Sequence, residues 1–380
     1  MNTTMQFAFF INNAGMIVLC IFALAFLVQF FYYWFFFSRL AFVKRRPGTE
    51  GFEPVSVVVS AHNEAYNLEK NLPLILEQDY PDFEVIVVND GSHDETDAVL
   101  TLLAHKYTHL KVVNVTQSVI FFRSKKFPLS VGIKSAKNEI LLLTDADCRP
   151  VSNQWIRRMQ ACYDKDAEIV LGYGPYEKLP GLLNLFIRYD TFQIALQYFS
   201  FALSGRSYMG VGRNLSYKKS LFFKHKGFIN HYHISSGDDD LFINAAATRI
   251  NARIQLNPDS YVFSEPKKTL KSWITQKRRH FTTGRYYKPK YRNLLGIQAL
   301  SAVVYYASLI YLLAIQFYWP FVLGVHGLRL ISRLMLYGYG AKKLNERNLY
   351  LLSPIFDPFF TFFNPLLAFI SLIFKSKKWK

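Results

Sequence analysis

Apolar residues gather at the two ends of the chain, and the middle alternates between short apolar runs and polar stretches. Residues 14–37 carry no charge and are long enough to cross a bilayer core, which needs about 20 helical residues. Apolar character returns after Pro289, in residues 294–318, 319–336 and 351–374. This pattern predicts membrane-spanning ends around a globular middle.

The three C-terminal segments differ in how well they suit a membrane. Residues 294–318 are a clear span, whereas Arg329 and Arg333 interrupt 319–336 and prolines break 351–374. Three full crossings would leave the basic tail outside, against the positive-inside rule. We therefore expect one of the two later segments to lie in the interface or to re-enter, and the proline-rich last one to be irregular. The two arginines share a helical face and should point at protein, headgroups or a polar ligand, or else snorkel.

The middle of the chain has the pattern of an α/β domain. Short, largely apolar runs, typical of strands buried on both faces, occupy residues 55–60, 83–89 and 140–143, and residues 111–115 are expected to form a further strand. Helical patterns lie between these runs. Strands that alternate with helices at this spacing predict right-handed βαβ units and a mainly parallel sheet.

Composition supports a membrane protein and orients it. The 380 residues are 51% hydrophobic, which is too apolar for one ordinary soluble domain. The net charge of +18 suits nucleic acid or an anionic membrane, and apolar ends flanked by Lys and Arg favour membrane lipids over nucleic acid. A basic flank after the first span, rather than before it, favours an uncleaved anchor over a signal peptide.

The same features give an expected location and three domains. Basic residues after the first span, and only three scattered cysteines, place the middle of the chain in the cytoplasm. We expect a multi-pass protein of the inner (plasma) membrane. Its parts are an anchor with a basic flank (1–46), a cytoplasmic domain (47–290) and a C-terminal membrane region (291–380).

Two carboxylates, Asp145 and Asp147, follow the apolar run 140–143. Open α/β sheets bind ligands beyond the carboxyl ends of their strands. Like charges this close repel unless a cation lies between them, and hard divalent cations take carboxylate and phosphate oxygens. The pair predicts a metal–diphosphate site, with a solvated turn as the alternative.

Further polar groups occupy comparable positions. Asp90 ends the second strand, where it could accept a hydrogen bond from a nucleotide base or merely cap the next helix. Residues 60–64 follow the first strand and contain no Gly, so a dinucleotide-binding turn is absent. Three aspartates in 237–241 suit a general base with a raised pKa, or an exposed helix start. The basic run 276–280 could hold a diphosphate or bind lipid headgroups.

In this order, the strings VVVSAHNE, VIVVNDGS, LLLTDADC, GVGRNL, GDDDL and QKRRH resemble the membrane-bound family 2 glycosyltransferases. The resemblance covers residues 55–287 and extends to the flanking spans. It implies an α/β GT-A fold, Rossmann-like with a mainly parallel sheet, as a cytosolic domain with N- and C-terminal transmembrane helices. The implied activity is an inverting hexosyl transfer from a nucleotide-diphospho-sugar to a lipid-linked, glycan or other membrane-proximal acceptor, assisted by Mg²⁺ or Mn²⁺. The alternatives are a processive polysaccharide synthase of the cellulose or hyaluronan synthase type, and a non-catalytic membrane-anchored nucleotide-binding module.

The resemblance also implies roles for the nucleotide and metal ligands. Residues expected to contact the nucleotide are Asn63, Glu64, Asp90, Lys126, Lys134 and Asp145. Asp145 and Asp147 are expected at the metal, Asp147 as the more direct ligand.

Catalytic and acceptor-side roles follow in the same way. Asp238 is the expected base, with Gly237 where the family usually has Glu, and Asp239 is the alternative base. Gln276 and Arg279 are expected at the catalytic centre, with Arg279 on the departing diphosphate. Residues expected on the acceptor side are Gly212, Arg213, Asn214 and His280. His280 stands where processive synthases carry Trp, which favours single additions.

Overall fold

The computed structural model describes residues 3–44, 51–115, 124–234 and 236–373, and the chain divides into two compact units. Residues up to Val43 and Pro289–Ile373 build a helical unit, and Lys44–Lys288 build a sheet unit. Both predicted membrane regions therefore contribute to one unit.

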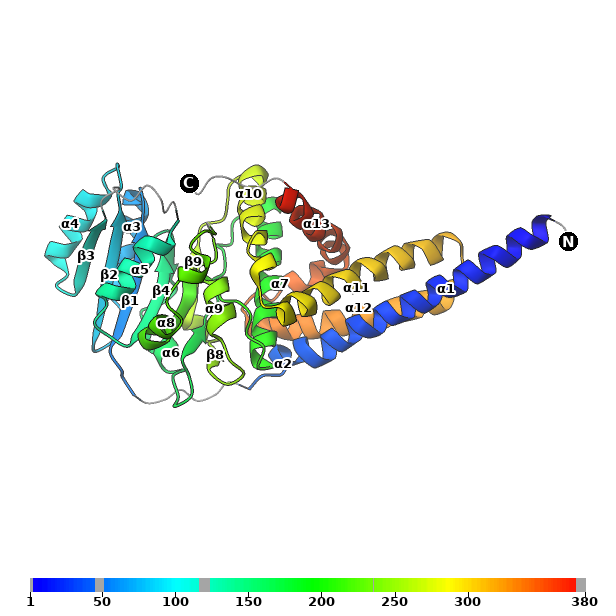
Figure 1. Ribbon diagram of the computed structural model, residues 1–380, viewed down its shortest axis with the longest axis horizontal. Coiled ribbons are helices and arrows are strands. Elements are labelled where there is room, and N and C mark those ends of the chain that lie inside the picture. Colours follow the sequence, from blue (N-terminus) through cyan, green and yellow to red (C-terminus); the bar gives the residue numbers. More distant parts are fainter. Residues whose placement is uncertain (1–2, 45–50, 116–123, 235, 374–380) are drawn as a thin grey trace. The chain divides into compact units, whose positions relative to one another are not determined.

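Four parallel strands form one side of the sheet unit (Figure 1). They are β1 (Val55–Ala61), β2 (Phe83–Asp90), β3 (Leu110–Val115) and β4 (Ile140–Asp145). They lie in the order β3-β2-β1-β4 within a seven-stranded sheet that continues β7-β6-β8. The predicted mainly parallel α/β fold is confirmed.

The remaining strands are short. β7 (Leu215–Lys218) runs antiparallel to β4 and to β6 (Ile169–Leu171), and β8 (Ala252–Ile254) runs parallel to β6. A separate two-stranded sheet pairs β5 (Cys148–Pro150) with β9 (Val262–Ser264).

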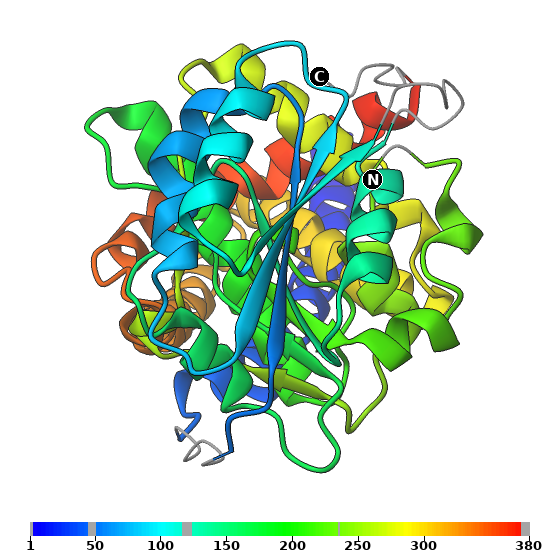
Figure 2. The same ribbon diagram turned by 90° about the vertical axis from the view of Figure 1, so that its left-hand side faces the viewer.

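Helices on both faces explain the continuous apolar runs of the parallel strands. Residues 57–59 of β1 are fully buried. Helices α3 (Ala65–Leu76) and α4 (Thr96–Lys106) cover one face, and α5 (Lys126–Ser135) covers the other (Figure 2). Because β1, β2 and β4 are covered on both faces, side chains on both faces of these strands are mainly apolar, whereas the edge strand β3 is half-exposed. The carboxyl ends of all four strands emerge at one edge of the sheet.

The later helices of the sheet unit carry the remaining polar clusters. They are α6 (Trp155–Gln160), α7 (Leu182–Leu203), α8 (Lys219–Lys224), α9 (Asp240–Ala246) and α10 (Leu270–Phe281). The start of α9 is capped by Asp239, which accepts a hydrogen bond from the Asp240 N–H, and that of α10 by Thr269, which accepts from the Ser272 N–H. Such caps satisfy main-chain donors that a helix start leaves unpaired.

The helical unit consists of long apolar helices. Its helices are α1 (Thr3–Phe31), continued by a π-helical turn (Tyr32–Phe37) into α2 (Ser38–Ala41), then α11 (Pro289–Ala314), α12 (Trp319–Lys343) and α13 (Ser353–Ile373). Within the described ranges, three helical stretches are long and apolar enough to cross a membrane: Asn13–Ala41, Pro289–Ala314 and Leu349–Ser371. The interrupted helix α12 is not among them.

The prediction of an irregular last segment is wrong, because α13 is helical throughout. Pro358 and Pro365 lie inside it. Each removes one main-chain hydrogen bond, a loss that membrane helices tolerate where neighbouring groups satisfy the freed carbonyls. Pro354, one residue after the helix start, costs no bond because the first helical N–H groups have no partner within the helix.

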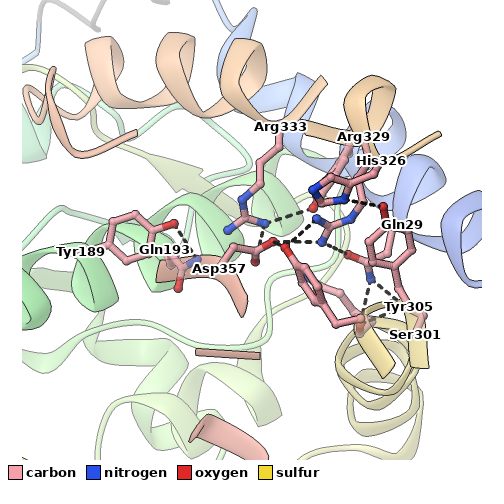
Figure 3. A network of polar contacts seen from close by, with 12 residues as sticks. Gln29, Tyr189, Gln193, Ser301, Tyr305, His326, Arg329, Arg333 and Asp357 are labelled. Carbon is pink, nitrogen blue, oxygen red and sulfur yellow. Dashed lines mark hydrogen bonds and ion pairs between the residues drawn. The ribbon is translucent and has the colours of Figure 1, made fainter. Parts of the chain in front are cut away.

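Arg329 and Arg333 of α12 point at protein, and the snorkelling alternative is wrong. Their side chains are 1% and 4% exposed. Asp357 of α13 lies between them, with its oxygens 3.0 Å from Arg329 Nη2 and 2.9 Å from Arg333 Nη1 (Figure 3). A buried charge is tolerated when it is paired in this way.

Side chains from the other helices complete this network. Arg329 donates to Gln29 of α1 and to the hydroxyl of Tyr306 of α11, and its guanidinium lies 4.5 Å from the ring centroid of Tyr305. Arg333 donates to the hydroxyl of Tyr33 at 3.0 Å. The network therefore joins all four segments of the helical unit.

We expect Asp357→Asn to destabilise the helical unit by about 3–5 kcal/mol, because two buried guanidinium groups lose the carboxylate that they share. Thermal unfolding in detergent measures the loss, with the exposed Asp166→Asn as the matched control. Adding Arg329→Met and Arg333→Met to Asp357→Asn should recover most of it. An unchanged melting temperature for Asp357→Asn would contradict this role.

Candidate active site

The parallel strands bring two predicted site residues to one edge of the sheet. Asp145 ends β4 and pairs in register with Ser60 of β1, and the next β1 residue pairs with Asn89 of β2. Asp90 follows Asn89, so Asp90 and Asp145 lie two strands apart. At about 4.8 Å between neighbouring strands, this separation is about 10 Å.

A lysine that the sequence analysis missed joins this edge to the acidic cluster. Lys125 Nζ contacts Asp145 directly and lies 3.8 Å from an oxygen of Asp238. Burial alone would raise the pKa of Asp145, but the Lys125 ammonium outweighs it and holds that pKa below its ordinary value. Carboxylates 93 positions apart in the chain therefore face one positive charge.

Asp145 and Asp147 supply an oxygen donor set. One oxygen of each and the sulfur of Cys148 all lie within 4.8 Å of one another. Burial raises the pKa of the Cys148 thiol well above its ordinary value, and this thiol donates to Asp147 at 3.4 Å. A protonated thiol is a poor ligand for a hard cation, so the carboxylates are the groups that fit Mg²⁺ or Mn²⁺.

The three aspartates before and at the start of α9 face different partners. Asp239 accepts from the Gly212 N–H at 2.8 Å and from the Asp240 N–H at 2.7 Å. Burial and the neighbouring carboxylates of Asp238 and Asp240 raise the pKa of Asp239 to about 7. Asp240 accepts from the hydroxyls of Thr283 and Tyr287. Asp238 is thus the member of the cluster that shares a cation with Asp145.

Gly212 and Arg213 lie beside this cluster. The Gly212 N–H donates to an Asp239 oxygen at 2.8 Å, so the turn lies directly against this cluster. The Arg213 guanidinium lies 4.3 Å from the ring centroid of Tyr176, and its charge also lowers the pKa of Asp145.

The acceptor-side prediction for Asn214 is wrong. Asn214 is fully buried, accepts from the indole N–H of Trp155 and donates to the carbonyls of Tyr173 and Ser260. Both the oxygen and the nitrogen of its amide are therefore bound inside the protein core. Asn214 stabilises the Gly212–Asn214 turn from the core side rather than facing an acceptor.

Helix α10 brings Gln276 and Arg279 towards the same edge. Gln276 donates to the Tyr176 hydroxyl at 3.1 Å. The ring of Tyr176 is the same one against which the Arg213 guanidinium lies. The positive charge of Arg279, like that of Arg213, acts on Asp145 and lowers its pKa. His280, at the end of α10, is exposed. Tyr176 belongs to none of the motifs, and no sequence signal pointed to it.

The basic run in α10 is not simply a surface patch. Lys277 is buried, forms an ion pair with Asp190 of α7, and lies 5.4 Å from the ring centroids of both Trp273 and Phe281. This ion pair links α10, the helix that carries Arg279, to α7.

We expect Asp190→Asn to lower the stability of the sheet unit by about 3 kcal/mol, because it leaves a buried ammonium without its carboxylate. The double variant Asp190→Leu with Lys277→Met should regain most of that loss, since neither charge is then buried. Thermal-shift measurements on both variants check this. Equal losses in the single and double variants would exclude the ion pair as the cause.

The predicted nucleotide contact of Lys126 is wrong. Its side chain is fully buried, and its ammonium donates to the carbonyls of His231, Ile234 and Ser236. An ammonium has three N–H donors, so none is left for a nucleotide.

Lys134, also predicted to contact the nucleotide, lies at the far end of α5 from the carboxyl edge of the sheet. Helix α5 begins at the carboxyl edge of the sheet with Lys126, eight residues before the exposed Lys134, a distance of about 12 Å along the axis. Lys111, near the start of β3, donates to the carbonyl of Ser135. The last turn of α5 therefore lies at the opposite edge of the sheet.

Asn63 and Glu64 form the turn after β1. Asn63 has a φ of 55° and accepts from the His93 N–H at 2.8 Å, and Glu64 accepts from the side chain of Asn67. His62 meets the Asp90 carbonyl at 2.6 Å. The loops after β1 and β2 are thus tied together beside Asp90.

Sequence comparison identifies relatives of this region. Residues 56–183 match Glycosyl transferase family 2. Over 140 residues the chain is 31% identical to the glycosyltransferase AglE of Haloferax volcanii, covering 36% of this chain and 44% of the relative. Over 121 residues it is 32% identical to a poly-beta-1,6-N-acetyl-D-glucosamine synthase of Staphylococcus epidermidis, covering 30% and 27%. The matches span less than half the length of either relative.

The fold has a solved counterpart. The structure is similar to that of the mannosyltransferase PcManGT from Pyrobaculum calidifontis in complex with GDP-Man and Mn²⁺, with a TM-score of 0.55 at 19% identity. The likeness covers 90% of this chain and 97% of that one, and it confirms the expected fold class.

Proposed function

Residues 56–183 belong to family 2 of the glycosyltransferases, and from this premise we propose that the protein transfers a sugar from a nucleotide-diphospho-sugar to a membrane-held acceptor, with inversion at the anomeric carbon. The observation that carries the proposal is the position of Lys125 between Asp145 and Asp238. It shows that a strand-end carboxylate and the acidic loop address one point in space.

The donor is proposed to lie along the carboxyl edge of the sheet. Asp90 and Asp145, about 10 Å apart across β1, would contact the base and the ribose–diphosphate part of one extended nucleotide. Asp90 is half-buried, beside the joined loops that carry His62 and Asn63.

Asp145 and Asp147 would hold the divalent cation, since their oxygens form the donor set that such an ion prefers. When bound, the ion would supply positive charge to the diphosphate as it departs. Arg279 adds positive charge on the same side: with Lys125, the main cause, and Arg213, it lowers the pKa of Asp145. Charge stabilisation of this kind is often the largest single contribution to catalysis.

Asp238 is proposed as the general base. It would take the proton of the acceptor hydroxyl while the oxygen forms a bond to the anomeric carbon and the bond to the diphosphate breaks. One displacement of this kind inverts the configuration. Asp239 suits the role less well, because both of its oxygens accept main-chain hydrogen bonds.

The acceptor is proposed to be lipid-linked and reached from the cytoplasmic leaflet. The basic flank after the first span supports a cytoplasmic sheet unit, by the positive-inside rule. Among the described residues only three stretches qualify as spans, which is few for a polymer channel and favours single additions. The likeness to a poly-beta-1,6-N-acetyl-D-glucosamine synthase makes a processive synthase the second candidate.

Release of nucleoside diphosphate from a panel of UDP- and GDP-sugars, in detergent with Mn²⁺, tests the proposal. We expect one donor to be consumed, and EDTA to stop the reaction. The same donor should raise the melting temperature by mass action. Product length on a lipid-linked acceptor separates single addition from polymerisation. If no donor were bound or consumed in the presence of Mn²⁺, a transferase would be excluded.

A further inference from the structure

A buried ammonium holds the loop that precedes Asp238. Lys126, the first residue of α5, is 0% exposed and donates to the carbonyls of His231 at 2.6 Å, Ile234 at 2.7 Å and Ser236 at 2.7 Å. The three carbonyls converge on one nitrogen as they would on a free cation. All three donors of the ammonium are used.

A second contact from the same helix holds the same loop. Ser130 lies one helical turn after Lys126, donates to the Lys126 carbonyl at 2.7 Å, and shares a hydrogen bond of 3.0 Å with the Tyr232 hydroxyl. Residues four apart lie on one face of a helix. One face of α5 therefore holds the loop at two points.

The chain turns sharply at Gly237, between the carbonyls that Lys126 binds and the proposed base Asp238. Gly237 has a φ of +94°, and a Cβ there would stand 2.5 Å from the Leu241 side chain. The positive φ therefore favours glycine at this position, and Ser236 is only two residues before Asp238 along the chain. We expect a shift of the Ser236 carbonyl to move Asp238 relative to Lys125.

The charge of Lys126 is retained at a cost. Burial lowers the pKa of Lys126 to about 8, although the carboxylates of Asp238, Asp240 and Asp239 act in the opposite direction. An apolar side chain would avoid this cost but would remove the Lys126 donor from all three carbonyls, of which, among the described residues, His231 alone keeps a main-chain donor, the Ile234 N–H at 3.1 Å. The Lys126 ammonium is thus needed because the main-chain carbonyls around it need its N–H donors.

We propose that Lys126 is a positioning residue that acts as a tethered cation: by binding three carbonyls of the loop, it fixes Asp238 opposite Lys125 and Asp145. This inference rests on the proposed function of Asp238. Two consecutive lysines then have different roles. Lys125 pairs with the carboxylates of Asp145 and Asp238, and Lys126 binds the main-chain carbonyls of the loop.

Lys126→Ala in the full-length protein tests the inference. A base displaced by about 1 Å costs about a hundredfold in turnover. We therefore expect turnover to fall by that factor, while calorimetry shows donor affinity near that of the wild type. Methylammonium, which is small and has three N–H donors, should restore turnover in a saturable way. Tetramethylammonium carries the same charge without N–H donors and should restore nothing.

Lys137→Ala is the matched control, because Lys137 is exposed just beyond the end of the same helix. It should keep wild-type turnover and show no response to methylammonium. Wild-type turnover in Lys126→Ala would overturn the inference. So would a loss that methylammonium leaves unchanged, or a loss of donor affinity alone.

Cleavage by chymotrypsin after Tyr232 gives a readout that does not depend on activity. We expect faster cleavage in Lys126→Ala, slowed again by methylammonium but not by tetramethylammonium. If Lys126→Ala does not fold, Lys126→Gln, which keeps two N–H donors, should show intermediate cleavage, and wild-type cleavage there would overturn the inference. If the wild type consumes no donor but cleavage responds as described, the proposed function fails and the hold on the loop stands.

Discussion

Asp238→Asn is expected to lower turnover by about 10²–10⁴-fold, the range that general base catalysis contributes. The amide has the size of the carboxylate but cannot take a proton from the acceptor hydroxyl. Donor affinity should change little, because the ammonium of Lys125 remains in contact with Asp145. Steady-state release of nucleoside diphosphate and calorimetry with the donor measure the two quantities.

Asp239→Asn is the matched comparison for this variant. Its amide oxygen can still accept one of the two main-chain hydrogen bonds that Asp239 accepts, and loss of the other costs about 1 kcal/mol. The expected loss of turnover is therefore about tenfold or less. If Asp239→Asn abolished transfer and Asp238→Asn retained it, the base would be Asp239.

Asp147→Ala is expected to remove the dependence of donor binding on the metal. Groups that only support a metal ligand already contribute about 10–100-fold to metal affinity, so loss of a ligand should cost about a hundredfold or more. In calorimetry, Mn²⁺ should strengthen donor binding by the wild type and leave binding by the variant unchanged.

Cys148→Ser tests whether the neighbouring thiol belongs to the metal site. Its sulfur lies near both carboxylates, but burial keeps the thiol protonated by raising its pKa. Mn²⁺ should therefore strengthen donor binding by Cys148→Ser as it does for the wild type. Metal dependence that survives in Asp147→Ala but disappears in Cys148→Ser would contradict the assignment of the carboxylates.

The first half of the sheet could be predicted from the sequence because three of its strands, β1, β2 and β4, are largely buried apolar runs. The edge strand β3 is half-exposed and contains Lys111 and Asn114, but all four strands were expected within a residue or two of their bounds. β6 and β8 have only three residues each, too few to carry a period. The last helix was misjudged because prolines end helices in water more strictly than in membranes.

Site residues at strand ends could be predicted from the sequence, and those placed by tertiary contacts could not. Asp90 and Asp145 end strands, and parallel topology alone brings such residues to one edge. Lys125 and Lys126 are consecutive and differ by about 100° around the helix, so the sequence did not show which of them faces the carboxylates. The Asp190–Lys277 ion pair joins two helices 87 positions apart and has no local signature. Asn214 matched a motif, but its burial could be seen only in three dimensions.

The most direct test is a structure of the full-length protein determined with Mn²⁺ and an unreactive donor analogue. We predict one diphosphate at the carboxyl edge of the sheet, with the metal between it and Asp147, Arg279 on the same diphosphate, and Asp238 facing the anomeric carbon. A nucleotide bound elsewhere, or bound at this edge with Asp238 and Arg279 directed into separate crevices, would contradict a single shared site.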